Sequence, residues 1–165
     1  MKKSNRVALA FFVMLAATAA LAQSDAQKSF DQLKSLAGTW EGKNSMNEPM
    51  QVSFKVTSNG SAVMSEINGH GENMITMFHL DGPNKLLLTH YCGAGNQPRM
   101  QASTSADGRT ITFNFLDATN LATPDAGHMQ RVAITVLDAN HHTEEWSFAD
   151  HGKEMKELFD LRRKM

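Results

Sequence analysis

The sequence has 165 residues, of which 41% are hydrophobic and 20% are charged, as is usual for a globular chain with a hydrophobic core. Sixteen Lys and Arg against 17 Asp and Glu give a formal net charge of −1. Because phosphate binding needs a basic face and none is visible, nucleic acid is excluded as a predicted partner. The single cysteine, Cys92, rules out a disulfide within these residues, so stability must come from the core.

Residues 1–22 have the three parts of a secretory signal peptide. Three basic residues stand within the first six positions, an apolar run follows over 7–20, and Ala20-Leu21-Ala22 matches an A-x-A cleavage site. The apolar run is shorter than the roughly 20 residues that a membrane-spanning helix needs. We therefore predict a periplasmic or secreted protein with no membrane span in the mature chain. That chain is a single domain over 23–165, and its 13 basic and 17 acidic residues give it a net charge of about −4.

The first element expected after the signal is one short helix over 24–37. Ser24 or Asp25 can cap its start, because either side chain can accept a hydrogen bond from the first turn. Phe30 and Leu33 fall on one face at helical spacing, and Gly38 is a typical residue just past a helix end.

Everything after this helix reads as short strands separated by turns. The strands show alternating apolar residues, and turn sequences such as Asp81-Gly82-Pro83-Asn84 separate them. A meander of this length removes its exposed edges by closing on itself. We predict an all-β, up-and-down antiparallel barrel of about ten strands, in which the one long connection, 118–128, lies at a mouth of the barrel. The predicted strands cover 38–44, 50–56, 61–68, 74–80, 85–92, 99–105, 110–117, 129–138, 142–149 and 154–164.

Gly38-Thr39-Trp40 at the start of the first strand and Arg163 on the last resemble a pattern of the calycin superfamily, which comprises lipocalins, fatty-acid-binding proteins and nitrobindin-like barrels. The resemblance implies that Arg163 lies over Trp40 and closes one end of the barrel. The mature chain is also similar to exported bacterial proteins of a domain of unknown function, which carry THYC…GNQPRM and a closing EEW-x-F … F-x-L-x-R.

Nitrobindin-like relatives bind haem through a histidine late in the barrel, and the resemblance offers three such positions. His141, His142 and His151 all fall in or next to predicted turns, and His141-His142 is expected in a solvated turn. We therefore predict no cofactor, with haem as the alternative that the resemblance leaves open.

The predicted strand 85–92 has two nearly apolar faces. Leu86, Leu88, His90 and Cys92 share one face, and Tyr91 lies on the other. We favour the face with His90 and Cys92 as the inward one, because its polar members lie together at the end that leads into Gly93. An apolar lumen with a few polar groups is the usual ligand site of a small barrel. The alternative is that Cys92 is a small buried hydrophobic residue and His90 a hydrogen-bonded histidine of the core. No metal is predicted, because two ligands are too few for a closed zinc site.

The segment 93–99 that follows contains two glycines, one proline and several hydrogen-bond donors. Asn96, Gln97 and Arg99 fit an anionic head group at the rim, with Arg99 binding a carboxylate or phosphate through two bonds. They fit equally well a loop whose amides bind its own backbone and whose Arg99 pairs with a surface acid.

Further candidates for the ligand site come from other strands. Glu66 is either an interior carboxylate, on a face with Met64, or a solvated one. The full predicted ligand-binding set is His90, Cys92, Tyr91, Asn96, Gln97, Arg99, His79, Glu66 and Trp146. The residues predicted to line the lumen are Phe54, Met64, Leu88, Phe113, Ile134 and Trp146.

Together these patterns indicate an exported barrel that binds a small apolar or amphipathic molecule by burial, without turnover. One alternative is an isomerase-like or hydrolytic enzyme with His90 as base and Cys92 or Glu66 beside it. Another is a barrel filled with its own side chains that has a structural or interaction role. The identity of the ligand and the oligomeric state do not follow from the sequence.

Overall fold

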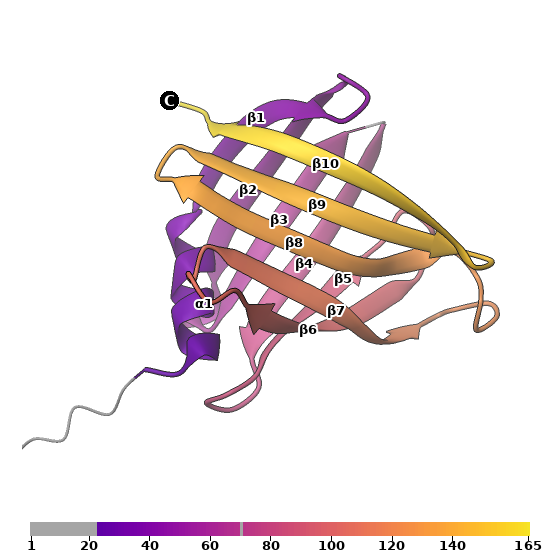
Figure 1. The fold of residues 1–165 in the computed structure, drawn as a ribbon, viewed down its shortest axis with the longest axis horizontal. Helices are drawn as coiled ribbons and strands as arrows, with labels where there is room; N and C mark the ends of the chain where they lie inside the picture. The colour runs from indigo at the N-terminus through magenta and orange to yellow at the C-terminus, as the bar shows by residue number, and fades with distance from the viewer. Residues whose placement is uncertain (1–22, 70) are drawn as a thin grey trace, which may run out of the picture.

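Ten antiparallel strands close into a barrel in the computed structural model, which describes residues 23–69 and 71–165 (Figure 1). Consecutive strands pair with each other, and β1 pairs with β10 to close the sheet. The predicted fold class is confirmed, whereas the predicted signal peptide, 1–22, lies outside the described residues. The strands are β1 Gly38–Asn44, β2 Pro49–Thr57, β3 Ala62–Gly69, β4 Glu72–Leu80, β5 Leu86–Tyr91, β6 Gln97–Thr104, β7 Thr110–Thr119, β8 His128–Asp138, β9 His141–Asp150 and β10 Lys153–Arg163.

The turns between the strands follow the sequence signals closely. In the β4–β5 turn, Gly82 has a φ of 71°, a conformation that favours glycine, and the Asp81 amide donates to the Lys85 carbonyl (2.9 Å). A short 3₁₀ turn, η1 Ser58–Gly60, joins β2 to β3. Tight turns of this kind fix the register of each hairpin, and the register decides which residues face the lumen.

The helix α1, Asp25–Ser35, covers one end of the barrel (Figure 1). Ser24 caps it, accepting a hydrogen bond from the Gln27 amide (3.2 Å), as predicted. Phe30 and Leu33 are buried against the barrel interior and supply the apolar face expected from their spacing. None of the described helices has the length and apolar character that a bilayer crossing requires.

The end of the barrel beneath α1 is sealed around Trp40, which is fully buried. Its indole N–H donates to the Leu36 carbonyl (2.8 Å), and the Arg163 guanidinium lies 4.2 Å from the centre of its ring. Arg163 also donates hydrogen bonds to the carbonyls of Ala37 (2.8 Å), Ser35 (3.0 Å) and Ala139 (3.0 Å). The contact between Trp40 and Arg163 that the resemblance implies is therefore present, and this end is called the closed end below.

Side chains fill the barrel from the closed end to about its middle. Of the residues predicted to line the lumen, five are buried, and Met64 is the exception. β3 buries Val63, Ser65 and Ile67, so Met64 and Glu66 lie on the outer face. The lumen position predicted for Met64 is wrong because Val63, its neighbour of opposite parity, pairs with the inward Phe78 of β4.

Candidate ligand-binding cavity

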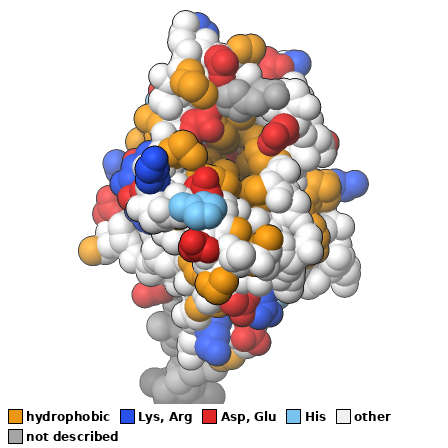
Figure 2. All heavy atoms as spheres, turned by 90° about the vertical axis from the view of Figure 1, so that its right-hand side faces the viewer, with side chains coloured by type: hydrophobic (Ala, Val, Ile, Leu, Met, Phe, Trp, Pro, Cys, Tyr) orange, Lys and Arg blue, Asp and Glu red, His pale blue; other side chains and the backbone are white. Residues whose placement is uncertain are grey.

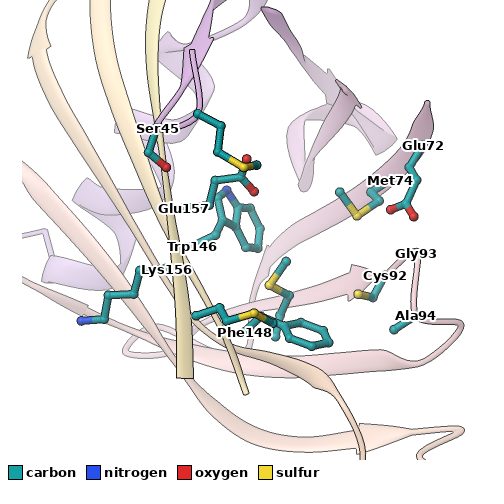
Figure 3. Close-up of a pocket in the computed structure, with 13 residues that line it drawn as sticks. Ser45, Glu72, Met74, Cys92, Gly93, Ala94, Trp146, Phe148, Lys156 and Glu157 are labelled. Atoms are coloured by element: carbon teal, nitrogen blue, oxygen red, sulfur yellow. The ribbon is translucent and has the colours of Figure 1, made fainter. Parts of the chain in front are cut away.

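A cavity of about 660 Å³ opens at the end of the barrel opposite α1. Figure 2 faces this open end and shows a hollow with hydrophobic side chains inside it and Asp and Glu side chains around it. The residues that line the cavity come from both ends of the chain and from its middle, and Figure 3 draws them. They are Ser45, Met46, Glu72, Met74, Cys92, Gly93, Ala94, Met129, Trp146, Phe148, Met155, Lys156 and Glu157.

Four methionines and two aromatic residues make the cavity wall mostly apolar. Unbranched thioether side chains adapt to ligands of different shape, which suits a binding site better than a rigid core. Trp146 and Phe148 come from β9, whose inward residues alternate along the strand. A molecule with an apolar body can therefore be buried here.

The floor of the cavity is Trp146, and a chain of buried polar contacts holds it. Its indole N–H donates to one Glu144 carboxylate oxygen (3.0 Å), and the other oxygen lies 3.2 Å from Nε2 of His142. The His142 ring in turn packs edge-on against Trp40, with ring centres 4.3 Å apart. These contacts link the cavity floor to the closed end, so the indole is held in one orientation.

The position of His142 corrects the expectation of a solvated turn. The preceding turn ends early, at Asn140, so β9 begins at His141 and His142 falls on the inward face, fully buried. His141, its neighbour of opposite parity, faces outward and contacts Asp160 (2.8 Å).

The inward face of β5 is the one with Leu86, Leu88 and His90, which are all buried. The register with β4 places His90 opposite Thr76, whose hydroxyl lies 2.8 Å from Nδ1 of the ring. The ring centre of His90 lies 4.8 Å from that of Trp146. Burial lowers the pKa of His90 to about 4, so the ring is neutral at pH 7, and its Nε2 is buried without a hydrogen-bond partner.

Cys92 lies one strand step above His90 and lines the cavity from the β5–β6 turn. Its amide donates to the Asn96 carbonyl (3.1 Å), and Gly95, with a φ of 80°, allows the tight return. Burial raises the pKa of the Cys92 thiol, and the charge of Glu72 raises it further. Cys92 and His90 are therefore both neutral at pH 7, and neither carries the charge that a thiolate–imidazolium pair requires.

We expect Cys92 to react slowly with iodoacetamide at neutral pH, because only the thiolate attacks and its formation is disfavoured here. The alkylation rate, followed by mass spectrometry, should be about tenfold or more below that of a small free thiol. Unfolding the same chain in urea should restore the ordinary rate. A folded chain that reacts faster than the free thiol would favour the enzymatic alternative.

The loop residues predicted for a head-group site are not gathered at the cavity. The Arg99 side chain is 57% exposed and binds Asp117 through two nitrogens on the outer face. Gln97 contacts Thr119 (2.8 Å), and Asn96 is buried with its amide on the Gly127 carbonyl (2.8 Å). The structure agrees with the second interpretation of this segment, in which the amide side chains bind groups of the protein itself and Arg99 pairs with a surface acid.

Three other candidates lie on the outside of the barrel. Tyr91 is 50% exposed, and His79 is exposed on the outward face of β4. Glu66 accepts a hydrogen bond from Asn73 (2.6 Å) on the outer face. The structure thus brings Cys92 and Trp146 to the cavity, with His90 packed against Trp146, and places the remaining predicted site residues elsewhere.

None of the three late histidines weighed for haem is among the described residues that line the cavity. His142 is enclosed by Trp40 and Phe54, His141 faces outward, and His151 is exposed beside Asp150. Nor do three His, Cys, Asp or Glu side chains come together as a metal site in the described part of the chain.

The sequence analysis did not predict several residues at the open end. Met155 and Glu157 share one face of β10, so strand alternation could have predicted that they point to the same side of the sheet. Ser45 and Met46 sit in a turn, where alternation gives no direction. His128 is buried against Phe115 (ring centres 4.6 Å apart), beyond the part of β7 and β8 that pairs, and strand alternation does not predict this contact.

The fold and the cavity define a closed antiparallel β-barrel with one sealed end and one open, largely apolar end. No protein-family model matches the chain, and a search of the curated proteins finds no match. Among solved structures, the crystal structure of Rv2717c from M. tuberculosis is similar, with a TM-score of 0.58 and 14% identity over 83% of this chain and 98% of that chain. This likeness concerns the fold and fits a calycin-like barrel. Membership of the exported family with the THYC…GNQPRM motif stays a prediction.

Proposed function

We propose that the mature chain, exported after cleavage near Ala22, binds a small, partly apolar molecule in the cavity at the open end of the barrel. The observation that carries this proposal is an apolar-walled cavity of about 660 Å³ in a barrel sealed at its other end. This volume falls within the roughly 300–1,000 Å³ of pockets that hold small ligands. Burial of apolar ligand surface supplies about 25 cal/mol per Å², less the ordering cost of association.

The alternative of an enzyme finds less support in the placement of the residues weighed for it. Glu66 lies on the outer face, and His90 packs against Trp146 and is not among the residues that line the cavity. The alternative of a barrel filled with its own side chains fits only the half near the closed end, because the other half contains the cavity lined by Trp146.

Export is proposed from the sequence of residues 1–22 alone. N-terminal sequencing of the chain recovered from the periplasm or medium tests it. A chain that keeps residues 1–22 in the cytoplasm would contradict it.

A cavity-filling variant tests the proposed site. Met74→Trp combined with Met129→Trp adds bulk on two walls of the cavity, so the neutral dye Nile red should bind about tenfold more weakly than to the unaltered chain. Dye fluorescence in a titration measures the affinity. Met77→Trp, on the outward face of the same strand as Met74, is the matched control and should leave binding unchanged. Equal dye binding by all three proteins would contradict the proposed site.

A further inference from the structure

We propose that Trp146 limits the length of the ligand that the cavity accepts, and that Glu144 fixes this limit by holding the indole ring. This inference rests on the proposed function and deepens it. It assigns a specificity-determining residue, a positioning residue and a class of ligand, an amphipathic molecule that enters with its apolar end first and keeps its polar end at the mouth.

The residues that line the cavity stop at a similar depth on two sides of the barrel. Along β5 and the turn after it, Cys92 lines the cavity, and the next inward residue, His90, is buried. Along β9, Trp146 is the deepest lining residue, and the next inward residue, Glu144, is buried. The cavity therefore ends at the level of the indole (Figure 3).

The Trp146 side chain reaches across the barrel interior at this level. Its ring centre lies 4.8 Å from that of His90 on β5, although β6, β7 and β8 stand between β5 and β9 in the sheet. On its own side, the strand register places Trp146 beside Val132 of β8 and Glu157 of β10. A ligand that enters from the open end thus meets the indole before it can reach β5 below Cys92.

The Glu144 carboxylate holds the indole from the side of the closed end. One oxygen accepts from the indole N–H (3.0 Å), the other lies 3.2 Å from Nε2 of His142, and both side chains are buried. The His142 ring packs against Trp40 and Phe54, which fixes that end of the chain of contacts. Because a buried carboxylate is costly unless it is hydrogen-bonded, the indole cannot turn away without leaving Glu144 short of a donor.

Behind the indole lies a polar atom that the ligand does not meet. Nε2 of His90 is buried and has no hydrogen-bond partner among the described residues, while Nδ1 lies 2.8 Å from the Thr76 hydroxyl. The Trp146 ring packs on this imidazole and offers an aromatic surface to the cavity in its place. The apolar end of a ligand suits that surface, whereas a polar end buried there would lose its hydrogen bonds to water.

A series of straight-chain alcohols from pentanol to dodecanol, each displacing Nile red from the mature chain, tests the length limit. Each added methylene should raise the affinity about fourfold until the chain reaches the indole, and further methylenes should add little. In Trp146→Leu this cut-off should move about two carbons towards longer alcohols, and in the milder variant Trp146→Phe about one. An unchanged cut-off in these variants overturns the inference alone. If no alcohol binds to the unaltered chain, the proposed function fails as well.

Phe148→Leu is the matched control for loss of an aromatic ring from the wall. Phe148 lies one inward position closer to the open end of β9, so this change should weaken all the alcohols by a similar factor without moving the cut-off. A cut-off that moves as far in Phe148→Leu as in Trp146→Leu would contradict the role given to Trp146.

A decanediol with a hydroxyl at each end tests the direction of entry. It should bind at least about tenfold more weakly than decanol, because one hydroxyl has to be buried against the indole without a partner. Equal affinity of the diol and decanol would overturn the inference that the apolar end enters first.

Two variants and one spectroscopic measurement test the positioning role of Glu144. Glu144→Gln keeps an oxygen that can accept from the indole and should keep the cut-off, whereas Glu144→Met removes the acceptor and should move it to longer alcohols. In the unaltered chain, the indole proton of Trp146 should exchange with solvent as slowly as that of Trp40, whose indole N–H also donates to a buried acceptor. Rapid exchange of the Trp146 proton, or an unchanged cut-off in Glu144→Met, would overturn this role.

Discussion

Arg163→Ala is expected to lower the free energy of unfolding by about 3 kcal/mol. The guanidinium covers Trp40 at 4.2 Å and donates to three carbonyls, two at the end of α1 and one in the β8–β9 turn. Removing it leaves these carbonyls without their donor and exposes one face of a buried indole. One side chain joins the helix, the first strand and the last, so its loss affects the whole closure.

Urea unfolding followed by far-UV circular dichroism measures this effect. Arg162→Ala is the matched control, because Arg162 is the exposed neighbour on the same strand and its loss should change stability by less than about 0.5 kcal/mol. Arg163→Lys keeps the positive charge but lacks the planar guanidinium that donates to several carbonyls. Its stability should lie between that of the unaltered chain and that of Arg163→Ala. Equal stability of the Arg162 and Arg163 variants would contradict this account of the closed end.

Acid is expected to destabilise the barrel through His90. In the unfolded chain His90 titrates near pH 6.5, whereas burial lowers its folded pKa to about 4. Between these two values the unfolded state binds more protons, so stability falls as the pH decreases through this window. At about 1.4 kcal/mol per pKa unit, the full loss is about 3 kcal/mol.

His90→Gln removes the titrating group and leaves an amide that can still bond Thr76. Its unfolding free energy should therefore vary less than that of the unaltered chain between pH 6.5 and 4, even if it is lower throughout. His79→Gln, which replaces an exposed histidine of β4, is the matched control. The His90 ring signals in a nuclear magnetic resonance titration give the folded pKa directly, and a value near 6.5 would refute the argument.

The fold was predictable because strand alternation and turn residues agree along the chain. Asp81-Gly82-Pro83-Asn84 forms the turn expected of it, and the register of ten hairpin-connected strands then follows from neighbour to neighbour. The contact between Trp40 and Arg163 at the closed end was predicted from the resemblance of Gly38-Thr39-Trp40 and Arg163 to the calycin pattern. Met64 failed because both faces of β3 carry apolar residues, so alternation alone did not assign the inward one.

The site was predictable only in part, because a cavity is formed by residues that lie far apart in the sequence. Cys92 and Trp146 line the cavity. The polar residues of segment 93–99 that were predicted to bind a ligand, such as Arg99, instead bind other protein groups outside the cavity. A short segment rich in hydrogen-bond donors indicates that hydrogen bonds form there, but the sequence does not show whether the partner is a ligand or the protein itself. Glu72 and Glu157 line one cavity because β4 and β10 both reach the open end, which the sequence alone does not show.

The central claim is that the open end buries a ligand, and the methionine methyl groups report on it most directly. With ¹³C-labelled methionine methyl groups, titration with decanol should shift the signals of Met46, Met74, Met129 and Met155, which line the cavity. Met64 and Met77 on the outer face and Met100 in the core should keep their positions. Signals that stay fixed for all four lining methionines, or that move only for the outer ones, would contradict a ligand-binding cavity in this barrel.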